Sequence, residues 1–104
     1  MEKIAFKMKL KPGMKAEYVK RHAEIWPELK QLLTDSGVRD YTIFLDEETN
    51  TLFGVQNTIG SEGSQDLGNL EIVQRWWKHM SDIMETNPDL SPVTIPLEKV
   101  WHMD

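Results

Sequence analysis

The spacing of apolar residues changes several times along the chain, and this succession constrains the fold more than any other feature. Residues 4–10 alternate strictly between two sides, which is typical of a half-buried strand. From residue 14 to residue 33, apolar side chains recur every three or four positions, as in an amphipathic helix, although Pro27 predicts a kink or a restart. Two further strand patterns follow at 38–45 and 51–59.

The second half of the chain continues the succession with a helix and a strand. The stretch 60–69 is polar and rich in glycine, which indicates a loop or a weak first helical turn. A three-four pattern over 73–84 predicts a second helix, and 93–103 predicts a last strand, where Pro96 suits only an edge or a strand start. The order β-α-β-β-α-β predicts a ferredoxin-like α+β fold with both helices on one face of an antiparallel sheet.

The other face of this sheet carries an exposed apolar residue. In the strand at 38–45, Tyr41 faces the helices. Val38, Thr42 and Phe44 then share the opposite side. An apolar side chain on a face that the helices leave open indicates contact with a partner subunit, so we expect a homodimer.

Composition narrows the classes of function. A chain of 104 residues is long enough for one core, so we expect residues 1–104 to form a single domain. The net charge of −5 repels phosphate backbones and argues against a nucleic-acid partner. The lack of cysteine excludes a disulfide scaffold and a thiolate metal site.

The distribution of apolar residues gives an expectation for location. The first eleven residues alternate apolar and charged side chains and lack the continuous apolar region of a secretion signal. No apolar run approaches the ~20 residues that cross a bilayer. We therefore expect a cytoplasmic protein that does not bind membranes.

Tyr18 and His22 are the first candidates for chemistry. They are four residues apart and share the apolar face of the first predicted helix, so both side chains point at the sheet. One interpretation is that they satisfy hydrogen bonds within the core. The other is a pocket between helix and sheet in which His22 acts as an acid or base, because its ordinary pKa lies near neutral pH.

Two adjacent tryptophans, Trp76 and Trp77, are the second candidates. Neighbouring helical residues point about 100° apart, so the two rings cannot occupy one narrow core stripe. Either one ring packs in the core and the other at a subunit contact, or both form an aromatic wall that stacks on a sugar. Small-molecule pockets combine such apolar walls with a few polar groups, and Tyr41 is placed to be one of them.

Other constellations are weaker. His79 and Asp82 share a helical face, but two ligands do not make a metal site. The sequence has no nucleotide-binding glycine motif, and no serine or threonine lies in a motif for an activated nucleophile. We therefore expect neither a metal nor a cofactor.

Several segments together resemble the L-rhamnose mutarotase family. They are YVKRHAEIWPEL, YTIFLD, QRWWKHM followed by DIM, and NPDLSP, and in this order they cover nearly the whole chain. Two departures concern the pocket rim. The stretch 60–69 is richer in glycine and serine than is usual in the family, and Leu90 stands where the family tends to have a polar residue.

The resemblance implies a fold, an activity and a set of site residues. It implies a dimeric α+β barrel, in which two ferredoxin-like subunits meet through their sheets, and interconversion of the α and β anomers of L-rhamnose. It assigns proton donation to His22, and it assigns sugar contacts to the positions of Tyr18, Tyr41, Trp76 and Trp77. Other deoxy-sugars remain open as substrates.

Mutarotation requires only proton transfers, to the ring oxygen and from the anomeric hydroxyl. His22 is the hypothesised donor, and Tyr18, a water molecule or the same histidine would carry the second proton. If the imidazolium is the acid, the rate should fall as the pH rises past its pKa. The alternatives are a cofactor-free or haem-degrading monooxygenase of the same fold, and a sugar-binding module without catalytic activity.

Overall fold

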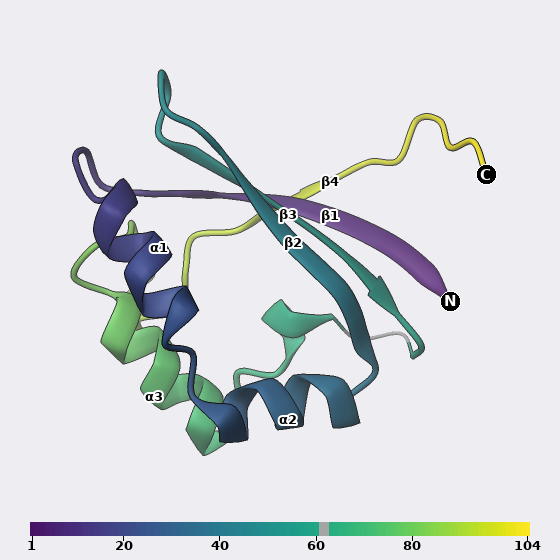
Figure 1. The fold of residues 1–104 in the computed structure, drawn as a ribbon, viewed down its shortest axis with the longest axis horizontal. Coiled ribbons are helices and arrows are strands. Elements are labelled where there is room, and N and C mark those ends of the chain that lie inside the picture. Colours follow the sequence, from purple (N-terminus) through teal and green to yellow (C-terminus); the bar gives the residue numbers. More distant parts are fainter. Residues whose placement is uncertain (61–62) are drawn as a thin grey trace.

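Four strands form one antiparallel sheet in the order β2-β3-β1-β4 (Figure 1). The computed structural model describes residues 1–60 and 63–104. The strands are β1 (Glu2–Lys9), β2 (Val38–Asp46), β3 (Thr51–Thr58) and β4 (Ile95–Leu97). Each pair of neighbouring strands is antiparallel, which is the strand arrangement expected for the ferredoxin-like α+β fold. The predicted fold class is therefore confirmed.

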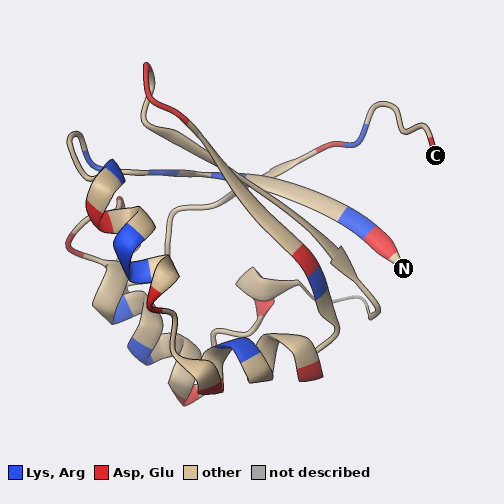
Figure 2. Ribbon diagram, in the orientation of Figure 1, with Lys and Arg blue, Asp and Glu red and all other residues tan. Residues whose placement is uncertain are grey.

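The helices all lie on one side of the sheet, as Figure 1 shows. They are α1 (Lys15–Ala23), α2 (Pro27–Asp35) and α3 (Glu71–Met80), and a short 3-10 helix, η1 (Ser64–Asp66), precedes α3. Figure 2 shows both signs of charge interspersed along these helices. Among the described residues, no helix combines the length and apolar character that crossing a membrane requires.

Pro27 divides the first helical segment into two helices. Trp26, the residue before the proline, is extended, with φ −63° and ψ 127°, because the proline ring disfavours helical geometry at the preceding residue. Pro27 then occupies the first turn of α2, where a missing N–H removes no helical hydrogen bond. The predicted restart is thus observed, and it turns the chain between α1 and α2.

The core fills the space between the sheet and the helices. Alternate residues of β1 and β3 point inward and meet the inner faces of α1, α2 and α3. The principal buried side chains are Phe6, Met8, Leu10, Tyr18, Leu29, Leu52, Val73, Trp76 and Met80. The helices therefore cover one face of the sheet and leave the other open.

Val38 corrects the predicted assignment of faces in β2. Arg39 pairs with Asn57 and Thr42 pairs with Val55, so β2 holds one residue more than β3 over this interval. This bulge reverses the alternation of sides. Val38 is consequently 5% exposed and lies on the same side as Tyr41, not with Phe44.

Phe44 remains on the open face, as predicted. Its side chain is 61% exposed and stands opposite Phe53 of β3. Ile95 and Leu97 on β4 are exposed as well. Apolar residues therefore extend across the strands on the side away from the helices.

Two elements are shorter than predicted. The helix predicted over 73–84 ends at Met80, although Ile83 and Met84 stay buried through contacts with the segment after β1. The last strand spans Ile95–Leu97 at the sheet edge, and residues 98–103 form no strand. The stretch 60–69 contains η1 and otherwise lacks regular structure in its described part, as expected, while residues 61–62 lie outside the described residues.

Candidate active site

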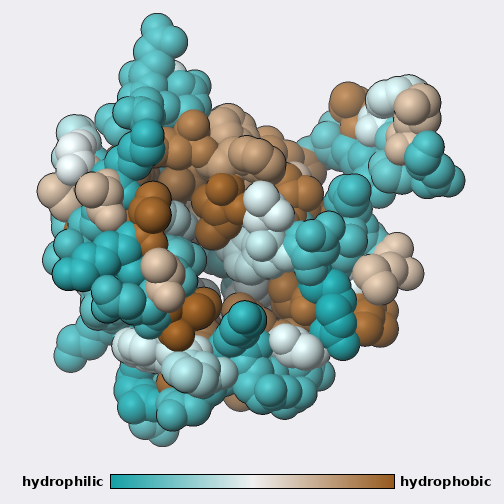
Figure 3. All heavy atoms as spheres, in the orientation of Figure 1, coloured by the Kyte–Doolittle hydropathy of each residue, from teal (hydrophilic) through white to brown (hydrophobic). Residues whose placement is uncertain are grey.

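A cavity of about 630 Å³ lies between the helices and the inner face of the sheet. The space-filling view in Figure 3 shows a hollow in this region. The volume is in the range of small-molecule sites, which occupy about 300–1,000 Å³. All five predicted site residues line it: Tyr18, His22, Tyr41, Trp76 and Trp77.

Tyr18 and His22 form one wall of the cavity from adjacent turns of α1. Their rings stack, with centroids 4.3 Å apart and planes inclined by 28°. His22 Nδ1 lies 3.1 Å from the carbonyl oxygen of Tyr18. Because a carbonyl oxygen accepts hydrogen bonds and cannot donate them, Nδ1 carries the proton and Nε2 is the nitrogen left for a ligand.

Burial sets the protonation of these two side chains. It lowers the pKa of His22 below the ordinary 6.5, and the hydrogen bond with the Tyr18 carbonyl opposes this shift in part. His22 is therefore predominantly neutral at pH 7. Burial, together with the nearby Tyr41, raises the pKa of the Tyr18 hydroxyl far above its ordinary value, so Tyr18 does not ionise at neutral pH.

The side chains of the two adjacent tryptophans point in different directions, as the 100° spacing predicts, and both line the cavity. Trp76 is buried, and its ring meets His22 edge-on with centroids 5.5 Å apart. Trp26 also meets Trp76 edge-on, with centroids 5.1 Å apart. Trp77 is half-buried and fits against Gly68, where a Cβ atom would come within 2.7 Å of the indole. Both indoles thus form part of the apolar wall of the cavity.

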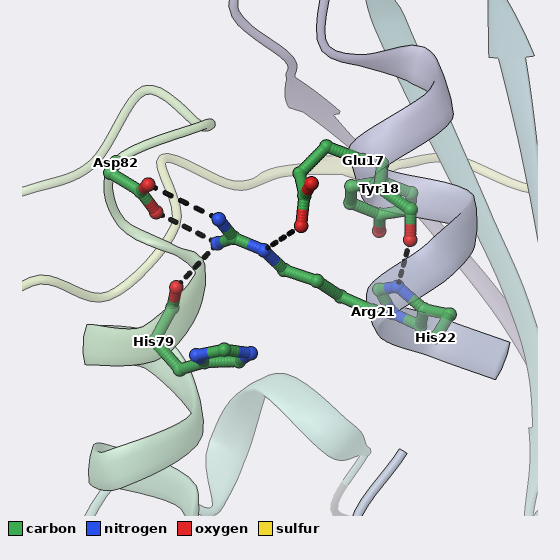
Figure 4. Close-up of polar contacts among 6 residues, drawn as sticks. All are labelled: Glu17, Tyr18, Arg21, His22, His79 and Asp82. Carbon is green, nitrogen blue, oxygen red and sulfur yellow. Dashed lines mark hydrogen bonds and ion pairs between the residues drawn. The ribbon is translucent and has the colours of Figure 1, made fainter. Parts of the chain in front are cut away.

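Arg21, the neighbour of His22, fastens α1 to the segment after α3 (Figure 4). Its guanidinium makes a two-pronged contact with the Asp82 carboxylate, at 2.7 and 3.2 Å, and also bonds Glu17 at 2.8 Å. These hydrogen bonds raise the pKa of Arg21 and lower the pKa of Asp82. The side chain of Arg21 is only 15% exposed, so the contact is partly shielded from water.

Tyr41 enters the cavity from β2, opposite α1. Its ring lies 6.1 Å from that of Phe6. Burial raises the pKa of Tyr41 to about 12, and the polar side chains of Ser64 and Gln65 act against this rise. Tyr41 is thus a neutral hydroxyl group at neutral pH.

Sequence reasoning missed a buried polar pair, Gln56 on β3 and Ser64 on η1. Ser64 lines the cavity, and Gln56 lies directly behind it. The signal was present in the sequence, because Gln56 alternates with Leu52 and Gly54 on the inward side of the predicted strand. A polar residue at such a position requires a partner, but the sequence does not say which.

Leu90 and Pro92, in the segment 87–92, line the cavity. The backbone of Leu90 has φ 71°, a left-handed conformation that is unusual for a leucine. The predicted departure at Leu90 therefore falls on the cavity. In the part of the chain that the structure describes, no three histidine, aspartate or glutamate side chains cluster as metal ligands would.

Comparison with known proteins identifies relatives over the whole chain. The sequence model of a family described as L-rhamnose mutarotase matches residues 3–103. A Bacteroides thetaiotaomicron protein named L-rhamnose mutarotase is 66% identical over 104 residues, which is 100% of both chains. A protein of the same name from Mesorhizobium japonicum is 61% identical over 98% of this chain and 97% of its own.

Solved structures agree with the sequence comparison. The crystal structure of an L-rhamnose mutarotase from Formosa agariphila matches with a TM-score of 0.92 and 58% identity over 100% of both chains. The crystal structure of an antibiotic biosynthesis monooxygenase matches with a TM-score of 0.59 and 11% identity, over 96% of this chain and 99% of that one, so it shares the fold alone. From its sequence and its structure, this chain belongs to the L-rhamnose mutarotase family.

Proposed function

We propose that this protein interconverts the α and β anomers of L-rhamnose by opening and closing the pyranose ring. Membership of the L-rhamnose mutarotase family supports the reaction. The observation that carries the mechanism is a half-buried His22 that lines the cavity and whose Nδ1–H is held by the Tyr18 carbonyl, which leaves Nε2 available for a ligand. We propose His22 as the catalytic residue, and Tyr18, Tyr41, Trp76 and Trp77 as sugar contacts.

The proposed reaction moves one proton between two oxygens of the same sugar carbon. Neutral His22 takes the proton of the anomeric hydroxyl at Nε2, and the resulting imidazolium donates it to the ring oxygen as the bond between C1 and that oxygen breaks. The open aldehyde turns about its C1–C2 bond, and the same steps in reverse close the ring on the other face. The histidine ends as it began, and no other reactant is consumed.

We propose that the same histidine is also the second proton carrier. An acid that begins as imidazolium would be scarce at neutral pH, because burial lowers the pKa of His22. Tyr18 stays protonated, because burial raises its pKa. Its hydroxyl is suited to orient a sugar oxygen, while the indoles of Trp76 and Trp77 supply apolar faces for the sugar ring.

The alternatives give different results in the same experiment. A non-catalytic sugar-binding module would bind L-rhamnose and leave anomer exchange at its rate in water. A cofactor-free or haem-degrading monooxygenase would not accelerate exchange, and the haem-dependent type would shift the Soret band of added haem. The 11% identity to the monooxygenase structure shows the fold alone and does not favour either type.

Saturation-transfer NMR of the anomeric protons tests the proposal. The purified protein should accelerate exchange between α- and β-L-rhamnose well above the rate in buffer. A panel of deoxy-sugars and their 6-hydroxylated counterparts then defines the substrate preference. The apolar side chain of Leu90, which lines the cavity, should influence this preference. Exchange at the buffer rate with every sugar would contradict the proposed activity.

We also propose a homodimer formed through the open face of the sheet. Exposed Phe44 stands opposite half-buried Phe53 on this face, and exposed Ile95 and Leu97 extend the apolar surface to β4. Apolar residues gathered on a face of a small domain favour a second copy as the partner. The dimeric α+β barrel implied by the family resemblance would join two sheets in this way.

The remaining expectations concern extent, partners and location. The family match over residues 3–103 supports a single domain. The net charge of −5 and the interspersed charges on the helices (Figure 2) support the expectation that nucleic acid is not a partner. A cytoplasmic location, without membrane binding, stays a prediction.

A further inference from the structure

Leu90 holds a backbone conformation that is unfavourable for its residue type. Its φ is 71°, in the left-handed region, where the Cβ atom of an L-residue comes too close to the following carbonyl oxygen. Among the described residues, Asp40 and Asn50 also have positive φ, at 49° and 56°. Aspartate and asparagine tolerate this region because their short polar side chains can bond to the local backbone, and a leucine side chain cannot. The turn alone would therefore favour asparagine or glycine at position 90.

Hydrogen bonds around Leu90 hold this backbone in place. The Leu90 N–H donates to the Asn87 carbonyl at 2.9 Å, and the Asn87 N–H donates to the Ser91 carbonyl at 2.8 Å. Asn87 Nδ2 also donates to Ser91 Oγ at 3.1 Å. Thr86 and Pro92 pair as an antiparallel bridge and close the base of the turn. The conformation of Leu90 is thus fixed by the segment in which it lies.

The side chain of Leu90 is buried against the cavity and not in the core. Pro88 and Asp89, which precede it, are exposed, whereas Leu90 is half-buried and lines the cavity. In the described part of the chain, the half-buried apolar side chains that pack against the core include Leu33 and Leu70 but not Leu90. Core packing therefore does not account for a leucine at this position. A strained residue that packing does not explain and that faces a ligand cavity indicates a role in function.

We propose that Leu90 is a specificity-determining residue that receives the C6 methyl group of L-rhamnose. The sugar carries hydroxyl groups on C1 to C4, and its methyl group is the one substituent that loses no hydrogen bond with water in apolar surroundings. L-Mannose has the same ring configuration and differs by one hydroxyl group on C6. Against a leucine side chain, that hydroxyl would lose its bonds with water and find no partner. This inference rests on the proposed function, since it takes L-rhamnose as the substrate.

The test compares L-rhamnose with L-mannose in wild type and in Leu90→Asn. Asparagine is similar in size, tolerates positive φ and offers hydrogen bonds to a hydroxyl group. We expect wild type to prefer L-rhamnose by about 10–100-fold in kcat/KM, and Leu90→Asn to reduce this preference at least about fivefold. Because the substitution relieves backbone strain, the melting temperature of the variant should equal that of wild type or exceed it by up to about 8 °C.

Two further variants separate specificity from packing. Leu90→Met keeps an apolar side chain of similar volume and should keep the preference for L-rhamnose. Leu45→Asn is the matched control, because Leu45 is also half-buried but packs against the core and does not line the cavity. It should lower the melting temperature and leave the preference unchanged, which is the opposite of what we expect for Leu90→Asn.

Exchange rates and melting temperatures together decide the outcome. An unchanged preference in Leu90→Asn would overturn the assignment, and so would a melting temperature more than about 4 °C below that of wild type, which would indicate a packing role. Equal exchange of both sugars by wild type would also overturn it and leave the proposed activity standing.

Binding measurements keep this inference separate from the proposed activity. If wild type bound L-rhamnose without exchanging its anomers, the proposed function would fail. The ratio of Kd for the two sugars, measured by titration calorimetry in wild type and Leu90→Asn, would then confirm or overturn the role of Leu90. Binding of neither sugar would overturn both proposals.

Discussion

Replacing His22 by asparagine separates proton transfer from folding and binding. The asparagine side chain is similar in reach and can still donate a hydrogen bond to the Tyr18 carbonyl, which lies 3.1 Å from Nδ1 in the wild type. It has no nitrogen that takes up and releases a proton near neutral pH. We therefore expect His22→Asn to fold, to bind L-rhamnose and to lose most of its acceleration of anomer exchange.

The structure sets the two magnitudes that must be distinguished. His22 makes two aromatic contacts, a stack on Tyr18 at 4.3 Å and an edge contact with Trp76 at 5.5 Å. Each is worth about 0.5–1.5 kcal/mol, so the free energy of unfolding should fall by about 1–3 kcal/mol. General acid–base catalysis contributes about 10²–10⁴-fold, which corresponds to about 3–5 kcal/mol in the barrier.

Saturation-transfer NMR measures the exchange rate, while circular dichroism and calorimetry report folding and sugar affinity. His79→Asn is a matched control, because His79 also lies 5.5 Å from Trp76 but is exposed and does not line the cavity. This control should exchange anomers at close to the wild-type rate. Near wild-type exchange by His22→Asn would refute the assignment and make Tyr18 the leading candidate.

The pH dependence of the wild-type rate tests which form of His22 begins the reaction. If neutral imidazole is the resting base, kcat/KM should rise with pH through the lowered pKa of His22, below 6.5, and stay level above it. An imidazolium that acts first would give the opposite slope. Stability should depend on pH over the same range, between the lowered pKa of His22 in the folded protein and its ordinary pKa of 6.5 in the unfolded chain. In this range the unfolded chain binds more protons than the folded one, so the free energy of unfolding should fall as the pH drops below 6.5.

Three further changes test the dimer, the aromatic wall and the fastening of α1. Phe44→Glu places a charge on the open sheet face and should shift the species in sedimentation velocity from dimer toward monomer, whereas a wild-type monomer at micromolar concentration would contradict the proposed interface. Trp76→Ala or Trp77→Ala should raise the half-saturating sugar concentration, with a loss of binding free energy on the scale of about 1–3 kcal/mol that aromatic stacking gives in nucleic-acid proteins. Trp77 is the cleaner test because its side chain is only half-buried, so its removal disturbs the core less. Unchanged sugar affinity in both folded variants would show that the two tryptophans serve only packing. Arg21→Met should lower the free energy of unfolding by about 1 kcal/mol, since the contact with Asp82 is partly shielded, and equal stability in a urea titration would show that the contact contributes nothing.

The parts of the fold that sequence predicted depend on local periodicity. The alternation in β1 and the spacing of four between Tyr18 and His22 are properties of a single element, so the inward faces of both followed directly. The order of those elements then left few topologies to consider. All five predicted site residues consequently line one cavity.

The parts that sequence did not predict depend on contacts between distant segments. The bulge in β2 comes from its pairing with β3, and it moved Val38 to the inner face. The pairing of Gln56 with Ser64 joins a strand to a loop whose path no local pattern specifies. Ile83 and Met84 continue the apolar spacing of α3, but they are buried by contacts with the segment after β1. Their spacing therefore correctly indicated that they are buried, although they do not belong to the helix.

The apolar surroundings of His22 are consistent with the order of proton transfers proposed here. Desolvation disfavours the charged imidazolium, so a catalyst that had to wait as imidazolium would be placed poorly between Tyr18 and Trp76. A catalyst whose resting form is the neutral imidazole carries no charge, so burial does not destabilise that resting form. The same desolvation then makes the transient imidazolium a stronger acid, which favours return of the proton to the sugar ring oxygen. The environment that lowers the pKa of His22 thus supports both halves of the reaction, provided that the neutral form begins it.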